Sequence, residues 1–433
     1  MKRTMIFLSA CLNLCAFSAD LYVAPSGNDS NSGDIDTPLL TLKTAIEKAT
    51  PATIIYLREG VYTPGVADVM QKNVEGNAYD CVYYLEKDGR YDAPITISGY
   101  PGEKATIDLS DIKTGKRILG FDMKGDYWHL KNFDIVGIQV TQTGHTQSIN
   151  VGLFGGSNCK IEGVNMHDGM GIGVYATKGH DNLVLNCDAY NNYDPVSENG
   201  KGGNCDGFGF HLKEPGSTGN RISGCRAWRN SDDGFDLINN FYPVVIENCW
   251  AWENGYDADR NRRADGTGFK AGGYGMKPTA IVPDTIPRNI VRNCIAWANK
   301  NQGFYANHHL GGLDFINNTS YQNWRNFNMI CRESAVHNVD VDGYDHHLIG
   351  NISYEPMLKD AHCVNINTES CTLTNNSFFS NNATVDSYFE SLDASQLLLP
   401  RKSDGSLPDI TFLKTRKDTA PYETRQGRDF FND

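Results

Sequence analysis

The chain has 433 residues, of which 40% are hydrophobic and 21% charged, and this composition excludes a disordered protein. The formal net charge of −13 and the absence of a long basic run argue against nucleic acid as a partner, because phosphate binding needs clustered lysine and arginine. The 43 glycines and the frequent Asn-Asn pairs tolerate left-handed backbone conformations, so they favour a protein rich in tight turns.

Residues 1–19 have the pattern of a secretory signal peptide. Two basic residues precede an apolar run, and small residues follow it. The run is too short for a membrane span, and no later segment is long and apolar enough to form a transmembrane segment. We therefore expect a secreted protein, extracellular or periplasmic, with a mature chain that begins at residue 20. Cys15 raises the alternative of a lipoprotein anchor, but the residues before it form a poor lipobox.

The mature chain opens with a short helical segment followed by a strand. Residues 40–49 have helical spacing, and residues 53–57 read as a first strand. An exposed end strand invites pairing with other chains. We therefore expect the helix to cap the open end of a β-structure.

A heptapeptide recurs along the middle of the chain. Four clear copies begin at residues 186, 224, 248 and 293, each with Cys second and Asn last. Weaker copies begin at residues 317, 350 and 375. The first five copies begin 38, 24, 45 and 24 residues apart, so the unit is 24 residues with insertions.

This unit matches one coil of a parallel β-helix, in which three short strands are joined by turns and insertions fall in loops. The sequence therefore predicts an all-β fold, a right-handed parallel β-helix that forms a single domain over residues 20–433. The repeat is lost after the copy at residue 375, and we expect the stretch after about residue 381 to pack along the outside.

The repeated Cys and Asn have structural interpretations. Small or apolar side chains alternate with polar ones in each copy, so Cys187, Cys225, Cys249 and Cys294 should point inward and form a column of buried thiols. Coils lie only about 4.8 Å apart, so a few disulfides remain possible. The closing Asn can donate hydrogen bonds along the stack.

A second feature, a Gly-Phe pair between two flanking positions, begins three residues after the closing Asn in two copies and behind an insertion in two others. Its copies span residues 206–209, 233–236, 267–270 and 302–305. If the phenylalanines stack inside, the flanking residues form two outward columns. One column contains Asp206, Asp233, Thr267 and Gln302, and the other contains Gly209, Asp236, Lys270 and Tyr305.

These columns bring carboxylates and a lysine together. Asp206 and Asp233 are one rung apart, and Asp232 and Asp236 flank them, so the four carboxylates repel unless a cation is bound. Hard oxygen ligands favour Ca²⁺. Lys270 lies one rung from Asp236, and a neutral amine is a competent base. Asp-Asp-Gly alone is more often only a turn, but here the register aligns several carboxylates with a lysine.

The motifs around these residues resemble family 9 of the polysaccharide lyases, which contains right-handed β-helix pectate lyases and related lyases. The resemblance rests on the copies at 206–209, 226–237 and 266–273, and it extends to residues 21–27, 125–131 and 318–321. It implies that Lys270 is the Brønsted base. It also implies a calcium site formed by Asp206, Asp232, Asp233 and Asp236.

Other residues of the presumed substrate face differ from the family's pectate-cleaving pattern. The pectate-cleaving members have a more basic stretch after the first Asp. Here Lys213 is the one basic residue retained from that stretch, and His211 stands two residues before it. The stretch that contains Tyr305 and His308 is less rich in Asn. We expect His211, Lys213, Tyr305 and His308 to contact substrate, and the differences make the rhamnogalacturonan backbone a rival to homogalacturonan. His308 and His309 could also bind a metal, although no third ligand stands at suitable spacing.

The sequence therefore predicts a secreted, monomeric polysaccharide lyase that cleaves an acidic pectic polysaccharide by calcium-assisted β-elimination. A β-helix polygalacturonase-type hydrolase is one alternative, because Asp232 and Asp233 could act as paired carboxylates. The Gly-His-Gly and Arg-Ile-Lys signatures of that class are absent. A non-catalytic carbohydrate-binding solenoid is the other alternative, but it would have no use for a base beside a cation.

Overall fold

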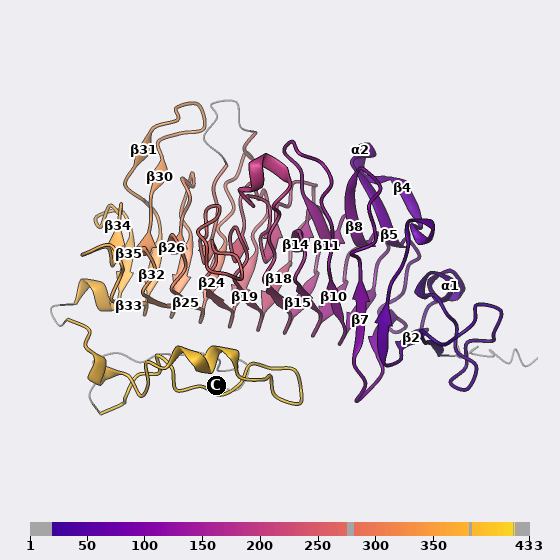
Figure 1. Ribbon diagram of the computed structural model, residues 1–433. Helices are drawn as coiled ribbons and strands as arrows, with labels where there is room; N and C mark the ends of the chain where they lie inside the picture. Colours follow the sequence, from indigo (N-terminus) through magenta and orange to yellow (C-terminus); the bar gives the residue numbers. More distant parts are fainter. Residues whose placement is uncertain (1–19, 275–280, 381–382, 419, 421–433) are drawn as a thin grey trace, which may run out of the picture.

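The computed structural model describes residues 20–274, 281–380, 383–418 and 420, so the expected signal peptide lies outside the described residues. The strands form three long sheets that run the length of the molecule (Figure 1). Successive strands of one sheet come from successive coils and pair in parallel, for example β12 (Lys160–Glu162) with β15 (Leu183–Leu185). The exception is β4 (Gln71–Asn73), which pairs antiparallel with β5 (Tyr79–Leu85). The expectation of a parallel β-helix is confirmed.

The three sheets contain 12, 10 and 11 strands and are called here the first, second and third sheet. The first sheet contains β1 (Leu21–Val23), β2 (Ile54–Leu57), β6 (Ile95–Gly99), β9 (Trp128–Lys131), β12 (Lys160–Glu162), β15 (Leu183–Leu185), β18 (Arg221–Ser223), β21 (Val245–Glu247), β24 (Ile290–Arg292), β27 (Asp314–Ile316), β32 (His347–Ile349) and β35 (Thr372–Thr374). The second sheet contains β3 (Gly60–Tyr62), β7 (Ala105–Asp108), β10 (Asp134–Val136), β13 (Asn165–His167), β16 (Asp188–Tyr190), β19 (Arg226–Trp228), β22 (Trp250–Trp252), β25 (Ile295–Trp297), β28 (Thr319–Tyr321) and β33 (Ile352–Tyr354).

The third sheet contains β4 (Gln71–Asn73), β5 (Tyr79–Leu85), β8 (Arg117–Met123), β11 (Ser148–Leu153), β14 (Gly171–Ala176), β17 (Phe208–Phe210), β20 (Phe235–Asp236), β23 (Phe269–Lys270), β26 (Gln302–Tyr305), β29 (Arg325–Asn328) and β34 (Cys363–Val364). A small antiparallel pair is formed by β30 (Cys331–Arg332) and β31 (Asp340–Val341). The helices are α1 (Leu42–Lys48) and the distorted α2 (Val74–Asn77), and 3₁₀ turns span Val66–Asp68, Ser197–Gly200, Ser377–Phe379, Asp386–Tyr388 and Ala394–Leu398. In the described part of the chain no helix has the length and apolarity needed to cross a membrane.

Helix α1 covers the N-terminal end of the solenoid, as the sequence predicts (Figure 1). It begins after Thr41, whose side-chain hydroxyl accepts a hydrogen bond of 3.2 Å from the Thr44 amide and so caps the helix. Its buried side chains Leu42, Ala45 and Ile46 join the hydrophobic core. The strand expected at 53–57 is β2, and β1 precedes it in the same sheet.

The repeated cysteines form a buried column inside the coils. The Cys187 amide lies 3.5 Å from the Cys225 Sγ, and the amides of Cys225 and Cys249 each lie 3.4 Å from the Sγ of the next cysteine in the column. These side chains are fully buried, and all ten cysteines of the described residues are free thiols. The inward position predicted for this column is confirmed.

The closing asparagines form a hydrogen-bonded ladder along the axis. The Asn254 Nδ2 donates to the Asn299 Oδ1 at 2.9 Å and to the Ala227 carbonyl at 3.0 Å, and the Asn254 Oδ1 accepts from the Asn230 side chain. The ladder satisfies backbone groups in the turn between the second and third sheets, where strand hydrogen bonds are missing. It thereby fixes the turn that precedes each Gly-Phe pair.

The C-terminal segment lies along the outer face of the second sheet (Figure 1). Phe389, Leu397 and Phe412 pack against the aromatic column that includes Trp252. Arg226 donates to the carbonyls of Leu397 and Leu399 while its guanidinium pairs with Asp188. The C-terminal segment thus packs on the outer face of the second sheet, whereas the outer face of the third sheet carries the polar columns.

Candidate active site and metal centre

A stack of phenylalanines inside the third sheet sets the position of the candidate site. The rings of Phe208, Phe235, Phe269 and Phe304 are fully buried, and successive centroids lie 5.1, 4.7 and 4.9 Å apart. The residue that follows each phenylalanine pairs in register with its counterpart on the next strand, across β17, β20, β23 and β26. The resulting column is Gly209, Asp236, Lys270 and Tyr305, as the repeat predicts.

Lys270 projects from β23 into the carboxylates of the preceding coil. Its Nζ lies 2.7 Å from the Asp233 Oδ2 and 3.3 Å from the Asp236 Oδ2. Its side chain is 13% exposed, so the amine is largely shielded from water. The structure therefore brings the predicted lysine into direct contact with two of the predicted aspartates.

The other column is held by contacts between backbone amides and carboxylates. The Asp233 amide donates to the Asp206 Oδ1 at 3.1 Å, and the Thr267 amide donates to the Asp233 Oδ1 at 2.6 Å. Each aspartate thus uses one oxygen to fix the next coil. The Asp236 Oδ1 is fixed in the same way, because it accepts from the Ile238 amide at 2.8 Å.

The acidic side chains fall into two groups that share Asp233. Oxygens of Asp206, Asp233 and Asp236 all lie within 4.8 Å of one another, and so do oxygens of Asp232, Asp233 and Asp265. Asp232 thus approaches the predicted cluster through Asp233 and contacts Asp265, whose amide donates to the Asp232 Oδ1 at 3.0 Å. The sequence analysis did not predict Asp265. It stands two residues before Thr267, whereas Asp232 stands one residue before Asp233, so the two acidic residues are not aligned in the repeat.

The shifted pKa values of the clustered aspartates show how much negative charge is concentrated there. Burial, followed by the charges of Asp232 and Asp236, raises the pKa of Asp206 well above its usual range. Burial also raises the pKa values of Asp232 and Asp233. Burial would do the same at Asp236, but the Lys270 ammonium and His211 hold the pKa of Asp236 below its usual range. Buried carboxylates at this spacing destabilise one another unless a cation compensates them.

The Lys270 amine responds to the same charges in the opposite sense. Burial alone would lower the pKa of Lys270, but the carboxylates of Asp233 and Asp236 outweigh burial and raise it well above its usual range. In the protein without a metal ion, Lys270 is therefore an ammonium that compensates part of the acidic charge. A cation bound to the carboxylates would remove this stabilisation of the ammonium and favour the neutral amine.

The donor set fits a hard divalent cation such as calcium. The donors of both acidic groups are carboxylate oxygens, with no thiolate or imidazole in either group, and hard oxygen donors are the ligands that calcium prefers. A spread of up to 4.8 Å between oxygens is about twice a Ca–O distance of ~2.4 Å. Asp206, Asp233 and Asp236 are the residues that would hold such an ion, with Asp232 beside them.

The residues expected to contact substrate lie around this centre in different environments. The His211 Nε2 lies 3.7 Å from the Asp236 Oδ2, too far for a hydrogen bond, and the His211 Nδ1 lies 2.8 Å from the Tyr175 hydroxyl. The Tyr305 hydroxyl lies 2.9 Å from the His308 Nε2. Lys213 is exposed at the end of the coil that carries His211.

His309 has a structural environment. Its Nδ1 accepts from the Gly273 amide at 3.1 Å, and its Nε2 lies 3.1 Å from the Pro287 carbonyl. Burial lowers the pKa of His309 to about 3. A neutral ring with both nitrogens engaged is not available to a metal, so the alternative of a His308–His309 metal site is wrong for His309.

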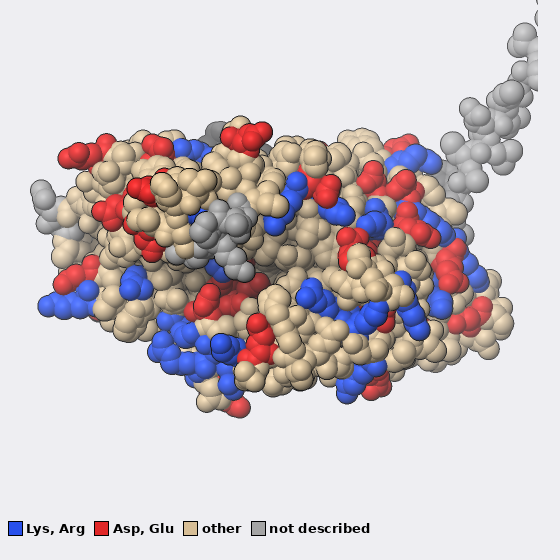
Figure 2. All heavy atoms as spheres, turned by 90° about the horizontal axis from the view of Figure 1, so that it is seen from above, with Lys and Arg blue, Asp and Glu red and all other residues tan. Residues whose placement is uncertain are grey.

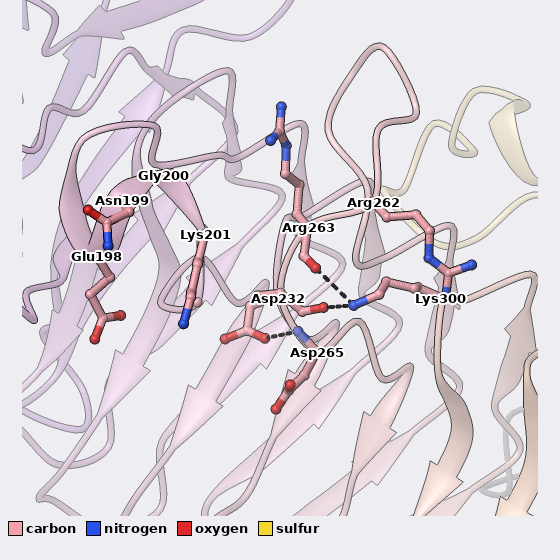
Figure 3. A pocket seen from close by; sticks show the side chains of 11 residues that line it. Glu198, Asn199, Gly200, Lys201, Asp232, Arg262, Arg263, Asp265 and Lys300 are labelled. Atoms are coloured by element: carbon pink, nitrogen blue, oxygen red, sulfur yellow. Dashed lines mark hydrogen bonds between the residues drawn. The ribbon is translucent and has the colours of Figure 1, made fainter.

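A cavity of about 610 Å³ adjoins the acidic cluster (Figure 3). Asp232 and Asp265 line it together with basic side chains from neighbouring turns, namely Lys201, Arg262, Arg263 and Lys300. Figure 2 shows acidic side chains within a hollow of this face and a group of basic side chains beside it. The cavity beside the acidic cluster therefore has both acidic and basic walls.

Comparison with known proteins identifies the family. Residues 21–348 match the family described as the Pel9A-like right-handed β-helix region. The chain is 32% identical to pectate lyase L of Dickeya dadantii (strain 3937) over 398 residues, which cover 91% of this chain and 83% of that protein. It is 30% identical to pectate lyase PEL9 of Emericella nidulans over 355 residues, 75% of this chain and 78% of that protein.

Two solved structures extend the comparison. A structure of a rhamnogalacturonan lyase superimposes with a TM-score of 0.89 at 43% identity, covering 93% of this chain and 97% of that one. The crystal structure of pectate lyase Pel9A superimposes with a TM-score of 0.72 at 30% identity, covering 92% and 90% of the two chains. The resemblance drawn from the motifs and the handedness of the solenoid are thereby confirmed. The chain belongs to the Pel9A-like family of right-handed β-helix proteins and is a polysaccharide lyase.

Proposed function

We propose that the protein is secreted and cleaves the backbone of a galacturonate-containing pectic polymer by β-elimination, with Lys270 as the base. The observation that carries this proposal is the position of the Lys270 Nζ, 2.7 Å from the Asp233 carboxylate, on the open face of a lyase fold. A rhamnogalacturonan lyase superimposes over nearly the whole chain at 43% identity, whereas the pectate lyase Pel9A does so at 30%. This difference favours the rhamnogalacturonan backbone over homogalacturonan as the substrate.

The chain's own residues divide the chemical work. The neutral Lys270 amine removes the proton on C5 of the uronate, and the electron pair of that C–H bond forms the C4=C5 double bond. The bond from C4 to the glycosidic oxygen breaks, and the oxygen leaves with its electron pair and takes a proton from water. The carboxylates of Asp206, Asp233 and Asp236 would hold a calcium ion, which when bound supplies a positive charge for the uronate carboxylate and acidifies the C5 proton.

The rigidity of the site supports this division. Each aspartate has one oxygen fixed by a backbone amide, so its other oxygen is directed without cost at the moment of reaction. An amine removes a proton only when it is neutral, so turnover is expected to rise with pH. The hydrolase alternative is less well supported, because Lys270 stands among the carboxylates where a hydrolase needs room for water.

One assay tests the proposal. Purified protein is incubated with rhamnogalacturonan or homogalacturonan, with calcium or with a chelator, and the ultraviolet absorbance of the unsaturated uronate product is followed. We expect absorbance with calcium, faster on rhamnogalacturonan, and little with the chelator. New reducing ends without absorbance would establish hydrolysis instead, and no cleavage of either polymer would contradict the proposal.

A further inference from the structure

The cavity beside the acidic cluster is bordered by positive charge that the proposed chemistry does not use. Figure 3 shows Asp232 and Asp265 near one another, with Lys201 on one side and Arg262 and Lys300 on the other. The volume of about 610 Å³ is typical of pockets that bind small ligands or single units of a polymer. Because Asp232 belongs to both the cavity wall and the acidic cluster, the cavity is continuous with the candidate active site.

The basic side chains differ in how their charge is compensated. Arg263 pairs with Asp257 and lies 4.3 Å from the centre of the Tyr193 ring, so its charge is neutralised. The Lys300 Nζ donates to the carbonyl of Arg263 at 2.8 Å and to the carbonyl of Ala264, and it lies within electrostatic reach of the carboxylates of Asp265 and Asp232. Within the described part of the chain, no ion pair joins Lys201 or Arg262 to an acidic side chain. In a protein of net charge −13, two exposed basic side chains without an ion-pair partner, Lys201 and Arg262, favour an anionic ligand at this cavity.

The loop that carries Arg262 is fastened at its base, so this side chain starts from a fixed backbone. The Gly255 amide donates to the Asn230 carbonyl at 2.8 Å, and the Arg263 amide donates back to the Gly255 carbonyl at 2.8 Å. Within the loop, the Asp257 Oδ1 accepts from the Asn261 amide at 2.8 Å. A fixed loop loses little conformational freedom when a ligand binds, which favours binding.

The opposite wall also has a defined backbone. Glu198 and Asn199, which line the cavity beside Lys201, have φ values of 47° and 61°. Left-handed residues of this kind recur in turns along the chain. The Glu198 amide is fixed by the Thr143 carbonyl at 2.9 Å, so this wall too is held in place.

We propose that the cavity lined by Lys201, Arg262 and Lys300 binds a second uronate of the same polymer, the next acidic sugar along the chain from the uronate that undergoes cleavage. The inference rests on the proposed function and names a subsite of that substrate. Carboxylates recur along both candidate backbones, on every sugar of homogalacturonan and on every second sugar of rhamnogalacturonan. A chain held at the Asp206–Lys270 cluster therefore places another carboxylate one or two sugars away. The cavity is the adjoining space where cations are available for that unit.

The test uses the full protein with Lys201→Gln, Arg262→Gln and the double variant, and Lys48→Gln as the control. Lys48 is exposed on the capping helix α1 at the far end of the solenoid. Lys201 and Arg262 are also exposed, so the variants should unfold at the wild-type temperature. The measurements are KM and kcat on rhamnogalacturonan at low and high salt, and affinity electrophoresis in gels containing the polymer.

We expect KM to rise about threefold in each single variant and about tenfold in the double variant, with a much smaller change in kcat. The salt dependence of KM should weaken in the double variant, because fewer screened charge contacts remain. Lys48→Gln should behave as wild type. A double variant with wild-type KM, salt dependence and gel retardation would overturn the subsite.

The electrophoresis separates this inference from the proposed function. If the wild type cleaves no polymer but the double variant still loses retardation, the subsite stands and the lyase assignment fails. If the wild type is an active lyase and the double variant is retarded equally, the lyase assignment stands and the subsite fails.

Discussion

At the scale of single residues, the site depends on carboxylates that serve two purposes. Asp233 fixes the Thr267 amide with one oxygen and contacts the Lys270 amine with the other. It also belongs to both acidic groups, so a cation held by either group would act on the Lys270 amine through Asp233. Its burial is complete, which makes its charge costly without a partner.

Asp233→Ala should weaken calcium binding at least about tenfold, because it removes a charged oxygen ligand from the centre of the cluster. Isothermal titration calorimetry with calcium measures the affinity. Asp36→Ala, at an exposed acidic residue of the N-terminal loop, is the matched control and should bind as wild type. Unchanged calcium affinity in Asp233→Ala would show that the ion binds elsewhere.

The sequence predicted the residues of the two outward columns, but it did not predict the residues that the insertions bring beside them. The register of Asp236, Lys270 and Tyr305 follows from counting residues from a buried phenylalanine, and the structure has that register. Asp265 escaped prediction because it ends an insertion of variable length, so no repeat fixes its position. The cavity formed by Lys201 and Arg262 escaped for the same reason.

At the scale of elements, the turns between the second and third sheets are held by the asparagine ladder. Asn254 is fully buried and links Ala227 to Asn299 and Asn230. The closing Asn of the repeat could be predicted as a stacking residue from the heptapeptide alone. The conformations of the insertions that follow it could not be predicted from the pattern, because their contacts involve residues far apart in sequence.

Asn254→Ala should lower the free energy of unfolding by about 3 kcal/mol, because it leaves several buried backbone and side-chain groups without partners. Chemical denaturation followed by tryptophan fluorescence measures this loss. Asn338→Ala, at an exposed asparagine outside the ladder, should change stability by less than about 0.5 kcal/mol. Equal stability of the two variants would refute the structural role of the ladder.

Strand β8 carries a buried acid of a different kind. Asp122 is fully buried, and in the described structure neither carboxylate oxygen has a hydrogen-bond partner. Burial raises the pKa of Asp122 to about 7. In the unfolded chain the pKa is about 3.9, so the unfolded state loses this proton first as the pH rises. The folded state is therefore progressively destabilised between about pH 4 and pH 7.

Asp122→Asn removes the titration and keeps the shape, so the variant should gain stability over wild type as pH rises. The gain at pH 8 relative to pH 4 has an upper limit of about 4 kcal/mol for a shift of about three pKa units. Thermal unfolding of both proteins at pH 4.5 and pH 8 provides the comparison. A difference in melting temperature that is the same at both pH values would contradict the raised pKa.

At the scale of the whole molecule, one 24-residue unit accounts for the architecture. The repeat predicts a solenoid, because each coil buries its apolar face only against neighbouring coils. The helix expected at residues 40–49 is α1, which covers the first coil, and the C-terminal segment shields the aromatic column of the second sheet. The outer face of the third sheet carries the polar columns, and a long polymer can lie along this face.

The path of the C-terminal segment is a part of the fold that the pattern does not determine. Its anchors are Arg401, which pairs with Asp188, and Phe389, which packs against Tyr354. These contacts join residues more than 30 positions apart, and Arg401 and Phe389 belong to no repeat. Sequence periodicity describes neighbours in a stack, so it carries no information on such contacts.

The central claim is that Lys270 is the base of a calcium-assisted β-elimination. The most direct measurement is the rate of absorbance increase on rhamnogalacturonan with saturating calcium, for wild type and for Lys270→Ala, with polymer binding measured in parallel. The account predicts that the variant loses about 10²–10⁴-fold in rate while calcium and polymer still bind. A Lys270→Ala enzyme with near-normal turnover would contradict it, because another residue would then carry the proton transfer.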